Sequence, residues 1–357
     1  MNEEVQAERY SRQVRVPVIG EDGQKRIAAA RVVVLGCGAL GTVAANLLAR
    51  AGVGQLLIID RDFVETSNLQ RQVLYNEADA LGGQPKAVAA ERHLRAINST
   101  IQIEGRIADA HPGNIESLIR DATVVVDATD NFEARFLLND ACVKAGIPWI
   151  YGGAVGVEGM TMTILPERTP CLRCVFESAP PPGLHPTCET AGILGGLTGV
   201  IGSWQANEAL KICAGRTDDI EQQLLSINLW RGEVRPLRLY RARGEDDNDG
   251  CPCCVKHQFE YLDAKATSTT TSLCGREAVQ VNPQPGARVD LVELARKMAS
   301  AAGASDVEQN AFLLRCHVPD PSGKPLELAV FGDGRAIIKG TKDATLARAV
   351  YAKYVGA

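Results

Sequence analysis

The chain of 357 residues lacks a block rich in lysine or arginine, and its formal net charge is only −5. Without such a block it cannot neutralise a run of phosphates, so the composition argues against a nucleic-acid-binding protein. It also lacks an apolar stretch long enough to cross a bilayer, and its first residues, MNEEVQAERYSRQ, are charged. We therefore expect neither a secretory signal nor a membrane span, and we predict a cytoplasmic protein.

No internal repeat is visible, and 45% hydrophobic with 23% charged residues is ordinary for a globular enzyme. The length exceeds that of a usual single domain. We expect a large domain over residues 1–255, a polar linker over 256–275 and a small α+β domain over 276–357. Acidic and polar stretches at 244–250 and 265–272 are typical of surface linkers.

Short apolar runs alternate with helical segments in the first part of the chain. Apolar runs at 31–35 and 55–60 flank a helical segment at 39–51, and continuous apolar runs suit strands buried on both faces of a parallel sheet. The alternation continues with expected helices at 84–97 and 131–145 and strands at 101–104, 123–127 and 148–152. We predict an α/β fold with a doubly wound, mostly parallel, Rossmann-like sheet.

The remaining segments predict an antiparallel extension and a separate small unit. A proline-rich crossing loop at 177–190 precedes a long glycine-rich helix at 191–214, and two antiparallel strands follow. Those strands are expected at 223–228 and 234–240, and the last part of the chain reads β-α-β-β-β-α, with elements at 278–281, 290–302, 310–317, 326–331, 336–339 and 343–354.

A glycine-rich turn follows the first predicted strand. In GCGALG, the glycines Gly36, Gly38 and Gly41 allow the backbone to approach a nucleotide phosphate at a helix N-terminus. Asp60 ends the next strand, where a carboxylate accepts hydrogen bonds from ribose hydroxyls. On this pair alone, an NAD-dependent oxidoreductase is the favoured interpretation.

The residues after Asp60 point instead to a bound triphosphate. The segment DRDFVETSNLQRQ is followed by GQPK and later by DATDN at a strand end. Cleavage at the α-phosphorus of a triphosphate needs several cations and a metal-binding carboxylate, which a dinucleotide site does not. These segments supply the candidate ATP- and Mg²⁺-binding residues Asp62, Asn68, Arg71, Gln72, Lys86, Asp130 and Asn131.

Six segments in order resemble one known family. RYSRQ at 9–13, GCGALG, DRDFVETSNLQRQ, GQPK, DATDN and TCETAGILGGLTGVIGSWQANEALK at 187–211 resemble the ThiF/MoeB group of ubiquitin-activating-like adenylyltransferases, and the resemblance, with the cysteine pairs below, covers about residues 8–255. It implies a homodimer that uses MgATP to adenylate the Gly-Gly C-terminus of a small ubiquitin-like, β-grasp sulfur-carrier protein.

The same resemblance implies a role for individual residues. It places Asp60 on the ribose, Asn68, Arg71 and Lys86 on the phosphates, and Asp130 on Mg²⁺. Arg12 is expected to reach the ATP of the partner subunit. In this chemistry catalysis rests on positioning and charge neutralisation, because the carboxylate is a poor nucleophile and pyrophosphate leaves with several negative charges.

Two C-x-x-C pairs predict a structural zinc site. Cys171 and Cys174 form the first pair, and Cys251 and Cys254 form the second. Four thiolates complete a closed tetrahedral Zn²⁺ set with no open position, which suits anchoring of a loop and not catalysis. Cys253 is an alternative to Cys254, in a C-x-C register with Cys251.

Cys188 lies just before the long helix, where a thiol can have a lowered pKa. The resemblance implies that in some members this cysteine attacks the acyl-adenylate to give a thioester or acyl-persulfide, whereas in others it is dispensable, so both interpretations stay open. The tail has no recognisable rhodanese domain, and Cys316 suits a buried strand. A separate sulfurtransferase is therefore a candidate partner, and the tail either docks the carrier or covers a surface.

Several functions stay open at this stage. Besides the adenylyltransferase, the alternatives are an NAD-dependent oxidoreductase and a non-catalytic nucleotide-binding scaffold, although the set Arg12, Arg71, Lys86 and Asp130 exceeds what a scaffold needs. A relative that dehydrates a modified tRNA base is disfavoured because no basic surface block is present. Molybdopterin, thiamin, cysteine and tRNA thiolation pathways remain equal candidates for the carrier.

Overall fold

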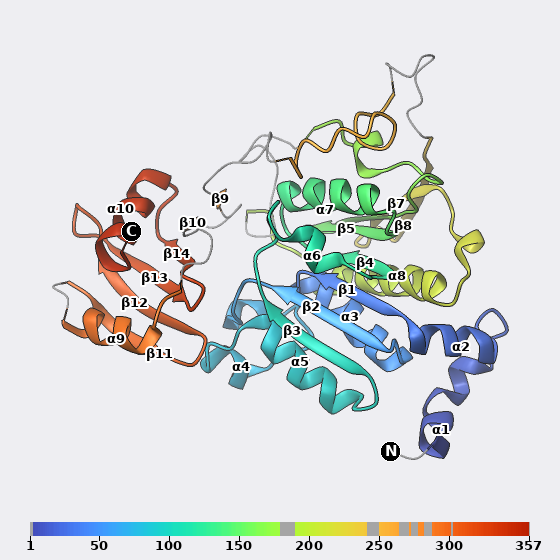
Figure 1. Ribbon diagram of the computed structural model, residues 1–357, viewed down its shortest axis with the longest axis horizontal. Helices are drawn as coiled ribbons and strands as arrows, with labels where there is room; N and C mark the ends of the chain where they lie inside the picture. The colour runs from blue at the N-terminus through green and yellow to red at the C-terminus, as the bar shows by residue number, and fades with distance from the viewer. Residues whose placement is uncertain are drawn as a thin grey trace. The chain divides into compact units, whose positions relative to one another are not determined.

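A computed structural model of the chain describes residues 3–178, 190–240, 250–263, 271–272, 278–281, 288–300 and 303–356. The chain divides into two compact units, Met1–Ala266 and Thr267–Ala357 (Figure 1). Cys188, Cys274 and most of the predicted crossing loop and polar stretches lie outside the described residues.

The first unit contains an eight-stranded sheet in the order β3-β2-β1-β4-β5-β6-β7-β8. The strands from β3 to β5 pair in parallel and those from β5 to β8 pair antiparallel, which confirms the predicted doubly wound sheet with an antiparallel extension. Their bounds are β1 (Arg31–Leu35), β2 (Gln55–Asp60), β3 (Gln102–Ile107), β4 (Val124–Asp127), β5 (Trp149–Val155), β6 (Glu158–Ile164), β7 (Gln223–Asn228) and β8 (Glu233–Arg238).

Strand β6 was not anticipated by the sequence pattern. Its segment, EGMTMTI, contains a glycine and alternates weakly, so only its pairing between β5 and β7 reveals it as a strand. Strand β8 at the edge is exposed along most of its length, and β5 is buried over its first five residues. A strand's surroundings, more than its own residues, therefore decide how apolar it must be.

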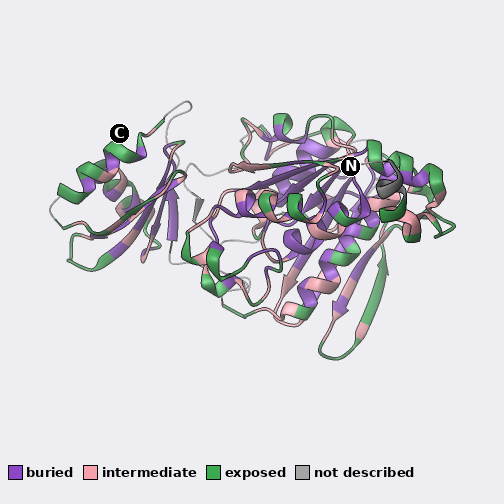
Figure 2. Ribbon diagram, turned by 90° about the horizontal axis from the view of Figure 1, so that it is seen from below, coloured by how far each residue is buried: buried purple, intermediate pink, exposed green. Residues whose placement is uncertain are grey.

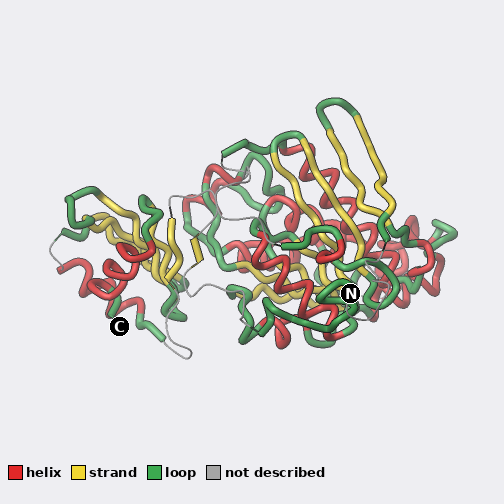
Figure 3. The backbone as a smooth tube through the Cα atoms, turned by 90° about the horizontal axis from the view of Figure 1, so that it is seen from above, coloured by secondary structure: helices red, strands yellow, loops and turns green. Residues whose placement is uncertain are grey.

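Helices cover both faces of this sheet (Figure 3). Their bounds are α1 (Glu3–Val14), α2 (Gly20–Ala29), α3 (Ala39–Ala51), α4 (Glu77–Leu81), α5 (Lys86–Ile97), α6 (Ile115–Ile119), α7 (Phe132–Ala145) and α8 (Gly195–Cys213), with 3-10 turns η1 (Thr66–Asn68), η2 (Leu172–Cys174) and η3 (Thr217–Asp219). In the part of the chain that the structure describes, none of the helices is sufficiently long and apolar to cross a membrane.

Helix α8 begins four residues later than the sequence pattern predicts. Residues before Gly195 are held in an extended connection, because Leu194 N–H donates to Gly156 O at 2.9 Å and Gly156 N–H donates to Gly192 O at 2.8 Å. Ile193 therefore pairs with Gly156 as an isolated parallel bridge instead of starting the helix.

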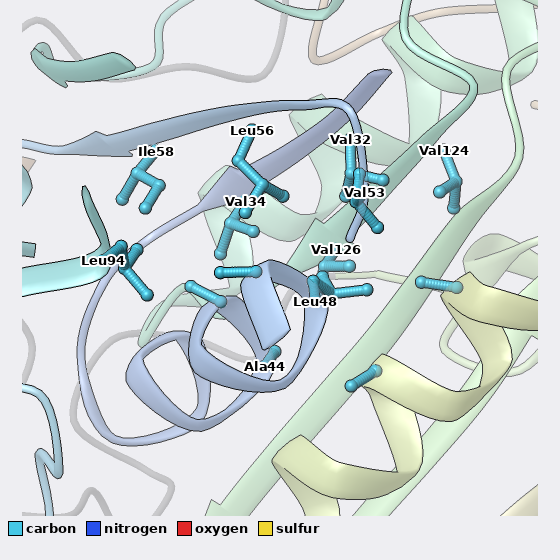
Figure 4. Packing of buried hydrophobic residues seen from close by; sticks show 14 of the residues in the cluster. Val32, Val34, Ala44, Leu48, Val53, Leu56, Ile58, Leu94, Val124 and Val126 are labelled. Atoms are coloured by element: carbon cyan, nitrogen blue, oxygen red, sulfur yellow. The ribbon is translucent and has the colours of Figure 1, made fainter. Parts of the chain in front are cut away.

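Alternate residues of the central strands face opposite layers of helices. Val32 and Val34 of β1 pack with α3, α5 and α8 (Figure 4), whereas Val33 and Leu35 pack with α6 and α7. Figure 2 shows these strands buried between helices whose outer surfaces are exposed. Burial on both faces explains the continuous apolar runs in the sequence.

The second unit is a six-stranded antiparallel sheet in the order β11-β12-β13-β14-β10-β9. Its elements are β9 (Thr271–Ser272), β10 (Ala278–Val281), α9 (Leu291–Ser300), β11 (Ser305–Gln309), β12 (Leu313–Pro319), β13 (Pro325–Phe331), β14 (Ala336–Lys339) and α10 (Ala344–Tyr354). The predicted β-α-β-β-β-α order lacked β9 and β11, because SDVEQ of β11 has no apolar face. Cys316 is buried in β12, as expected.

Candidate active site

The carboxyl ends of β2, β1 and β4 lie side by side, and the glycine turn follows the middle strand of the three. Gly36 has φ +90°, and a Cβ there would lie 2.5 Å from Ala128 O. A Cβ on Gly41 would lie 2.1 Å from Gly36 O. Both positions therefore require glycine, whereas at Gly38 the space beside the N-terminus of α3 is open except for Gln72.

Asp60 binds the glycine turn through its carboxylate. Cys37 N–H donates to Asp60 Oδ2 at 2.6 Å, and Asp62 N–H donates to Asp60 Oδ1 at 2.7 Å. Burial raises the pKa of Asp60, and the charge of Lys86 opposes that rise. Asp60 thus lies directly beside the glycine turn, at the end of β2 where the sequence predicts a ribose site.

Lys86 is brought to the same edge by α5. Its Nζ lies 3.3 Å from Asp62 Oδ2, and the side chain is only 4% exposed. Lys86 N–H also donates to Asp62 O at 2.9 Å. The sequence places these two residues 24 positions apart, and the fold joins them into a nearly buried ion pair.

Tyr75 was not among the predicted site residues, yet it connects the turn to the helix that carries Lys86. Its hydroxyl lies 2.8 Å from Cys37 O and 3.1 Å from Lys86 O, so one O–H is shared between two backbone carbonyls. Tyr75 is buried, and only its spatial position, not its sequence context, reveals this link.

The segment 65–72 holds three candidate residues in different ways. Asn68 is 1% exposed and accepts a hydrogen bond from Glu65 N–H at 3.0 Å, which closes the turn η1. Gln72 is 3% exposed, and its Oε1 is buried without a hydrogen-bond partner among the described residues. Arg71 is half-buried, and its Nη1 donates to Ser67 O at 2.9 Å.

Residues 127–131 place one exposed and one buried carboxylate at the end of β4. Asp130 is exposed, and Asn131 caps α7 by accepting from Ala134 N–H at 2.8 Å. Asp127 is buried and lies 3.5 Å from Arg135 Nε. Burial raises the pKa of Asp127, whereas Arg135 and the hydrogen bonds from Thr129 oppose that rise.

Helix α8 reaches the same region from the far part of the chain. A Cβ on Gly195 would lie 2.8 Å from Gln70 O, so the start of α8 packs against the backbone next to Arg71. Arg12 is separate from this edge within its own chain. It is exposed on α1, whose Tyr10 packs against Gly52 at the opposite end of α3 from the glycine turn.

The four predicted zinc ligands come together. The sulfur atoms of Cys171, Cys174, Cys251 and Cys254 all lie within 4.8 Å of one another. Two of the distances, 3.7 Å from Cys171 to Cys251 and 3.5 Å from Cys174 to Cys254, are close to the sulfur separation of about 3.8 Å that tetrahedral Zn–S bonds of about 2.3 Å require. The donor set therefore fits Zn²⁺.

Cys253 has a different partner. Asn139 Nδ2 donates to Cys253 Sγ at 3.2 Å, and Asn139 Oδ1 accepts from Leu172 N–H at 2.9 Å. One buried asparagine of α7 thus holds both cysteine segments, and the cluster of four sulfur atoms contains Cys254 and not Cys253. Next to it, Asp140 Oδ2 accepts from Tyr261 N–H at 2.9 Å, so residues just after the cysteines pack on α7.

Neither Asn139 nor Arg135 was predicted to take part in a site. A signal existed, because both are polar residues inside an otherwise apolar helical segment, FEARFLLNDACV. Polar groups in such positions need buried partners. The sequence does not name those partners, since Cys253 and Asp127 approach only in the folded chain.

Comparison with known proteins shows the family of the chain. The ThiF family matches residues 10–253. The sulfur carrier protein ThiS adenylyltransferase of Bacillus subtilis is 42% identical over 348 residues, 98% of this chain and 99% of the relative. The SAMP-activating enzyme E1 of Haloferax volcanii is 42% identical over 269 residues, 74% of this chain and 96% of the relative.

A third relative and a solved structure extend the comparison. The bovine adenylyltransferase and sulfurtransferase MOCS3 is 42% identical over 325 residues, 89% of this chain and 69% of the relative. The crystal structure of Escherichia coli MccB with SeMet MccA superimposes with a TM-score of 0.57 at 24% identity, over 67% of this chain and 73% of that one, and it shows the fold alone. With matching motifs, fold and relatives across both units, this chain belongs to the ThiF family.

Proposed function

We propose that this chain uses MgATP to adenylate the C-terminal Gly-Gly carboxylate of a ubiquitin-like sulfur-carrier protein, with release of pyrophosphate. The observation that carries the proposal is the buried Lys86–Asp62 pair beside the glycine turn, at the sheet edge that also holds Arg71 and Asp130. A turn that binds phosphate, flanked by cations and an exposed carboxylate, suits a triphosphate with its metal.

In this proposal each group neutralises or positions charge. The N-terminus of α3 and Gln72 hold phosphate oxygens, and Asp60 accepts from the ribose hydroxyls. Lys86, Arg71 and Asn68 stabilise the charge that develops as pyrophosphate leaves. Asp130, supported by Asn131, contributes one carboxylate to Mg²⁺, which typically binds one or two protein carboxylates together with substrate phosphates. Mg²⁺ supplies further charge neutralisation when bound.

The buried Asp62 acts on the reaction through Lys86. At 3.3 Å its carboxylate positions the ammonium group and offsets part of the cost of burying that charge. Attack by the carrier carboxylate on the α-phosphorus forms the acyl–O–P bond as the bond to pyrophosphate breaks. Since neither step moves a proton, no general base is required.

A second step at Cys188 belongs to the same proposal. Its thiolate would attack the carrier's acyl carbon, forming a thioester and releasing AMP, and a sulfurtransferase that delivers a persulfide would give the acyl-persulfide instead. The relatives named adenylyltransferase and sulfurtransferase support a sulfur-donating partner. The relative that matches both units is named for ThiS, so a ThiS-type carrier is the first substrate to test.

We also propose that the chain works as a homodimer in the cytoplasm. Arg12 is exposed and far from the glycine turn of its own chain, as a residue that serves a second subunit would be. The outer face of α8 presents small residues and Trp204, which is 39% exposed, along a groove of about 720 Å³. That groove is lined by Gly196, Gly199, Val200, Ser203, Trp204, Asn207, Glu208 and Lys211, and it suits close packing of a second copy.

ATP–pyrophosphate exchange tests the proposed reaction. The full chain with MgATP and a ThiS-type carrier should exchange labelled pyrophosphate into ATP, and the exchange should disappear when the carrier lacks its terminal Gly-Gly. A carrier-dependent exchange excludes the oxidoreductase. Reduction of NAD⁺ by a small substrate, with no exchange for any β-grasp carrier, would contradict the proposal.

A further inference from the structure

Arg61 is a cation enclosed by carboxylates at the same edge of the sheet. It directly follows Asp60 at the end of β2, and its Nη1 lies 3.0 Å from Asp109 Oδ1. Both partners are largely buried, with 14% and 17% of their side chains exposed. The sequence pattern gave no role to either residue, and no step of the proposed reaction uses them.

The charges around Arg61 come from the carboxyl ends of three strands of one sheet, β3, its neighbour β2, and β4, which is separated from β2 by β1. Asp60 ends β2 and Asp62 follows it, Asp109 follows β3 and Asp130 follows β4. Burial lowers the pKa of Arg61, but Asp109 first, then Asp62, Asp130 and Asp60, raise it above its ordinary value. Arg61 is therefore permanently positive, and its charge interacts with all four carboxylates.

Four carboxylates at one edge conflict with binding of a polyanion. ATP brings several negative charges to this edge, and unscreened carboxylates would repel it. The same carboxylates would attract a divalent cation even without nucleotide. Lys86 pairs with Asp62 and its charge also acts on Asp60, whereas Asp109 pairs with a second cation, Arg61, which directly follows β2.

We propose that Arg61, held by Asp109, is a positioning residue of the nucleotide site that keeps the acidic edge from binding a divalent cation before the nucleotide arrives. This inference rests on the proposed function, because it takes MgATP as the ligand. It predicts that removal of Arg61 changes two affinities in opposite directions. Loss of Arg61 strengthens metal binding to the nucleotide-free protein and weakens binding of metal-free ATP.

The predicted change in metal affinity is tested by Mn²⁺ titration, followed by electron paramagnetic resonance. The titration uses zinc-loaded, full-length protein without nucleotide. Arg61→Gln should bind Mn²⁺ at least fivefold more tightly than the unsubstituted chain. Asp109→Asn removes a negative charge from the same pair and should bind Mn²⁺ at least threefold more weakly. If the Arg61–Asp109 ion pair were only structural, both substitutions would change the Mn²⁺ affinity in the same direction. Shifts of the same sign in the two variants would therefore overturn the proposal.

Calorimetric titration of ATP in EDTA tests the predicted change in affinity for metal-free ATP. Arg61→Gln should raise the dissociation constant at least fivefold, and Arg61→Lys, which keeps the charge, should stay within about twofold of the unsubstituted protein. Arg106→Gln is the matched control, because Arg106 forms an exposed pair with Glu104 on β3. Unchanged ATP affinity in Arg61→Gln would overturn the proposal, and so would a loss of affinity in Arg106→Gln as large as that in Arg61→Gln.

The two outcomes are separable from failure of the proposed function. If carrier-dependent exchange fails in the unsubstituted chain, the adenylation proposal fails whatever Arg61 does. The Mn²⁺ titration needs neither carrier nor turnover, so it reports on Arg61 alone. Melting temperatures of both variants, which lose the same ion pair, show whether each is folded.

Discussion

Lys86 Nζ lies 3.3 Å from Asp62 Oδ2 at a position where only 4% of the lysine side chain is exposed. Burial of an ammonium group is costly unless a carboxylate accompanies it. The fold accepts that cost beside the glycine turn, where a cation can reach a phosphate. The Lys86–Asp62 pair is therefore the feature of the structure that most directly supports the proposed chemistry.

Lys86→Met should lower carrier-dependent pyrophosphate exchange by about 10²- to 10³-fold, because a single group aimed at developing charge has that effect elsewhere. The loss should appear in kcat and not only in KM for ATP. Lys144→Met is the control, since Lys144 pairs with Glu116 at 3.0 Å with roughly half of each side chain exposed. Exchange that survives within tenfold in Lys86→Met would argue against a role for this lysine in the transition state.

The cysteine cluster predicts different results for adjacent residues. Cys254→Ser should lose the bound zinc and lower the melting temperature by about 5 °C or more, because metal binding is coupled to folding. Cys253→Ser should keep one zinc ion per chain, since its sulfur accepts from Asn139 outside the cluster. Zinc content by mass spectrometry distinguishes the two, and loss of zinc from Cys253→Ser instead would show the other register.

Mixing of two inactive variants tests the homodimer. If Arg12 serves the partner's site, Arg12→Ala and Lys86→Met should each be inactive alone. When the two variants are co-expressed and pair at random, half of the dimers are mixed, and each mixed dimer contains one complete site of two. About a quarter of the exchange activity should therefore return. Arg9→Ala is a suitable control, since Arg9 donates to Ile97 O within its own chain. Absence of any recovery in a proven mixed dimer would place Arg12 outside the active site.

Cys37 in the glycine turn should be chemically inert. Burial raises its pKa to about 12, so the thiol stays protonated, and the thiolate is the reactive form. At pH 9, iodoacetamide should label Cys37 at least about a hundredfold more slowly in the folded protein than in guanidinium, as measured by peptide mass spectrometry. Equal labelling rates would contradict the burial of this thiol.

The same shift has a consequence for stability. Because the folded-state pKa of Cys37 is raised, its contribution is fully present below the ordinary thiol pKa and is lost as the pH rises toward about 12. The free energy of unfolding should therefore fall over that interval, and Cys37→Ala should make the fall shallower. Denaturant unfolding at pH 8 and pH 11 measures the difference.

The sequence by itself determined the features that short segments encode. Gly36 and Gly41 mark a turn in which any Cβ would collide with backbone, and the apolar runs at 31–35 and 55–60 mark strands buried on both faces. The C-x-x-C spacing also identified the four cysteines that meet. In each case the physical constraint acts within a few residues, so the local pattern carries it.

Tertiary structure alone decided which distant groups meet. The pairs Lys86–Asp62, Arg61–Asp109 and Arg135–Asp127 join residues on, or directly after, different strands and helices, and the hydrogen bond from Asn139 to Cys253 spans 114 positions. Such contacts depend on strand order and helix packing, which no residue specifies by itself. The sequence therefore names the chemical groups available to this site, and the packing of the sheet determines which charges are compensated there.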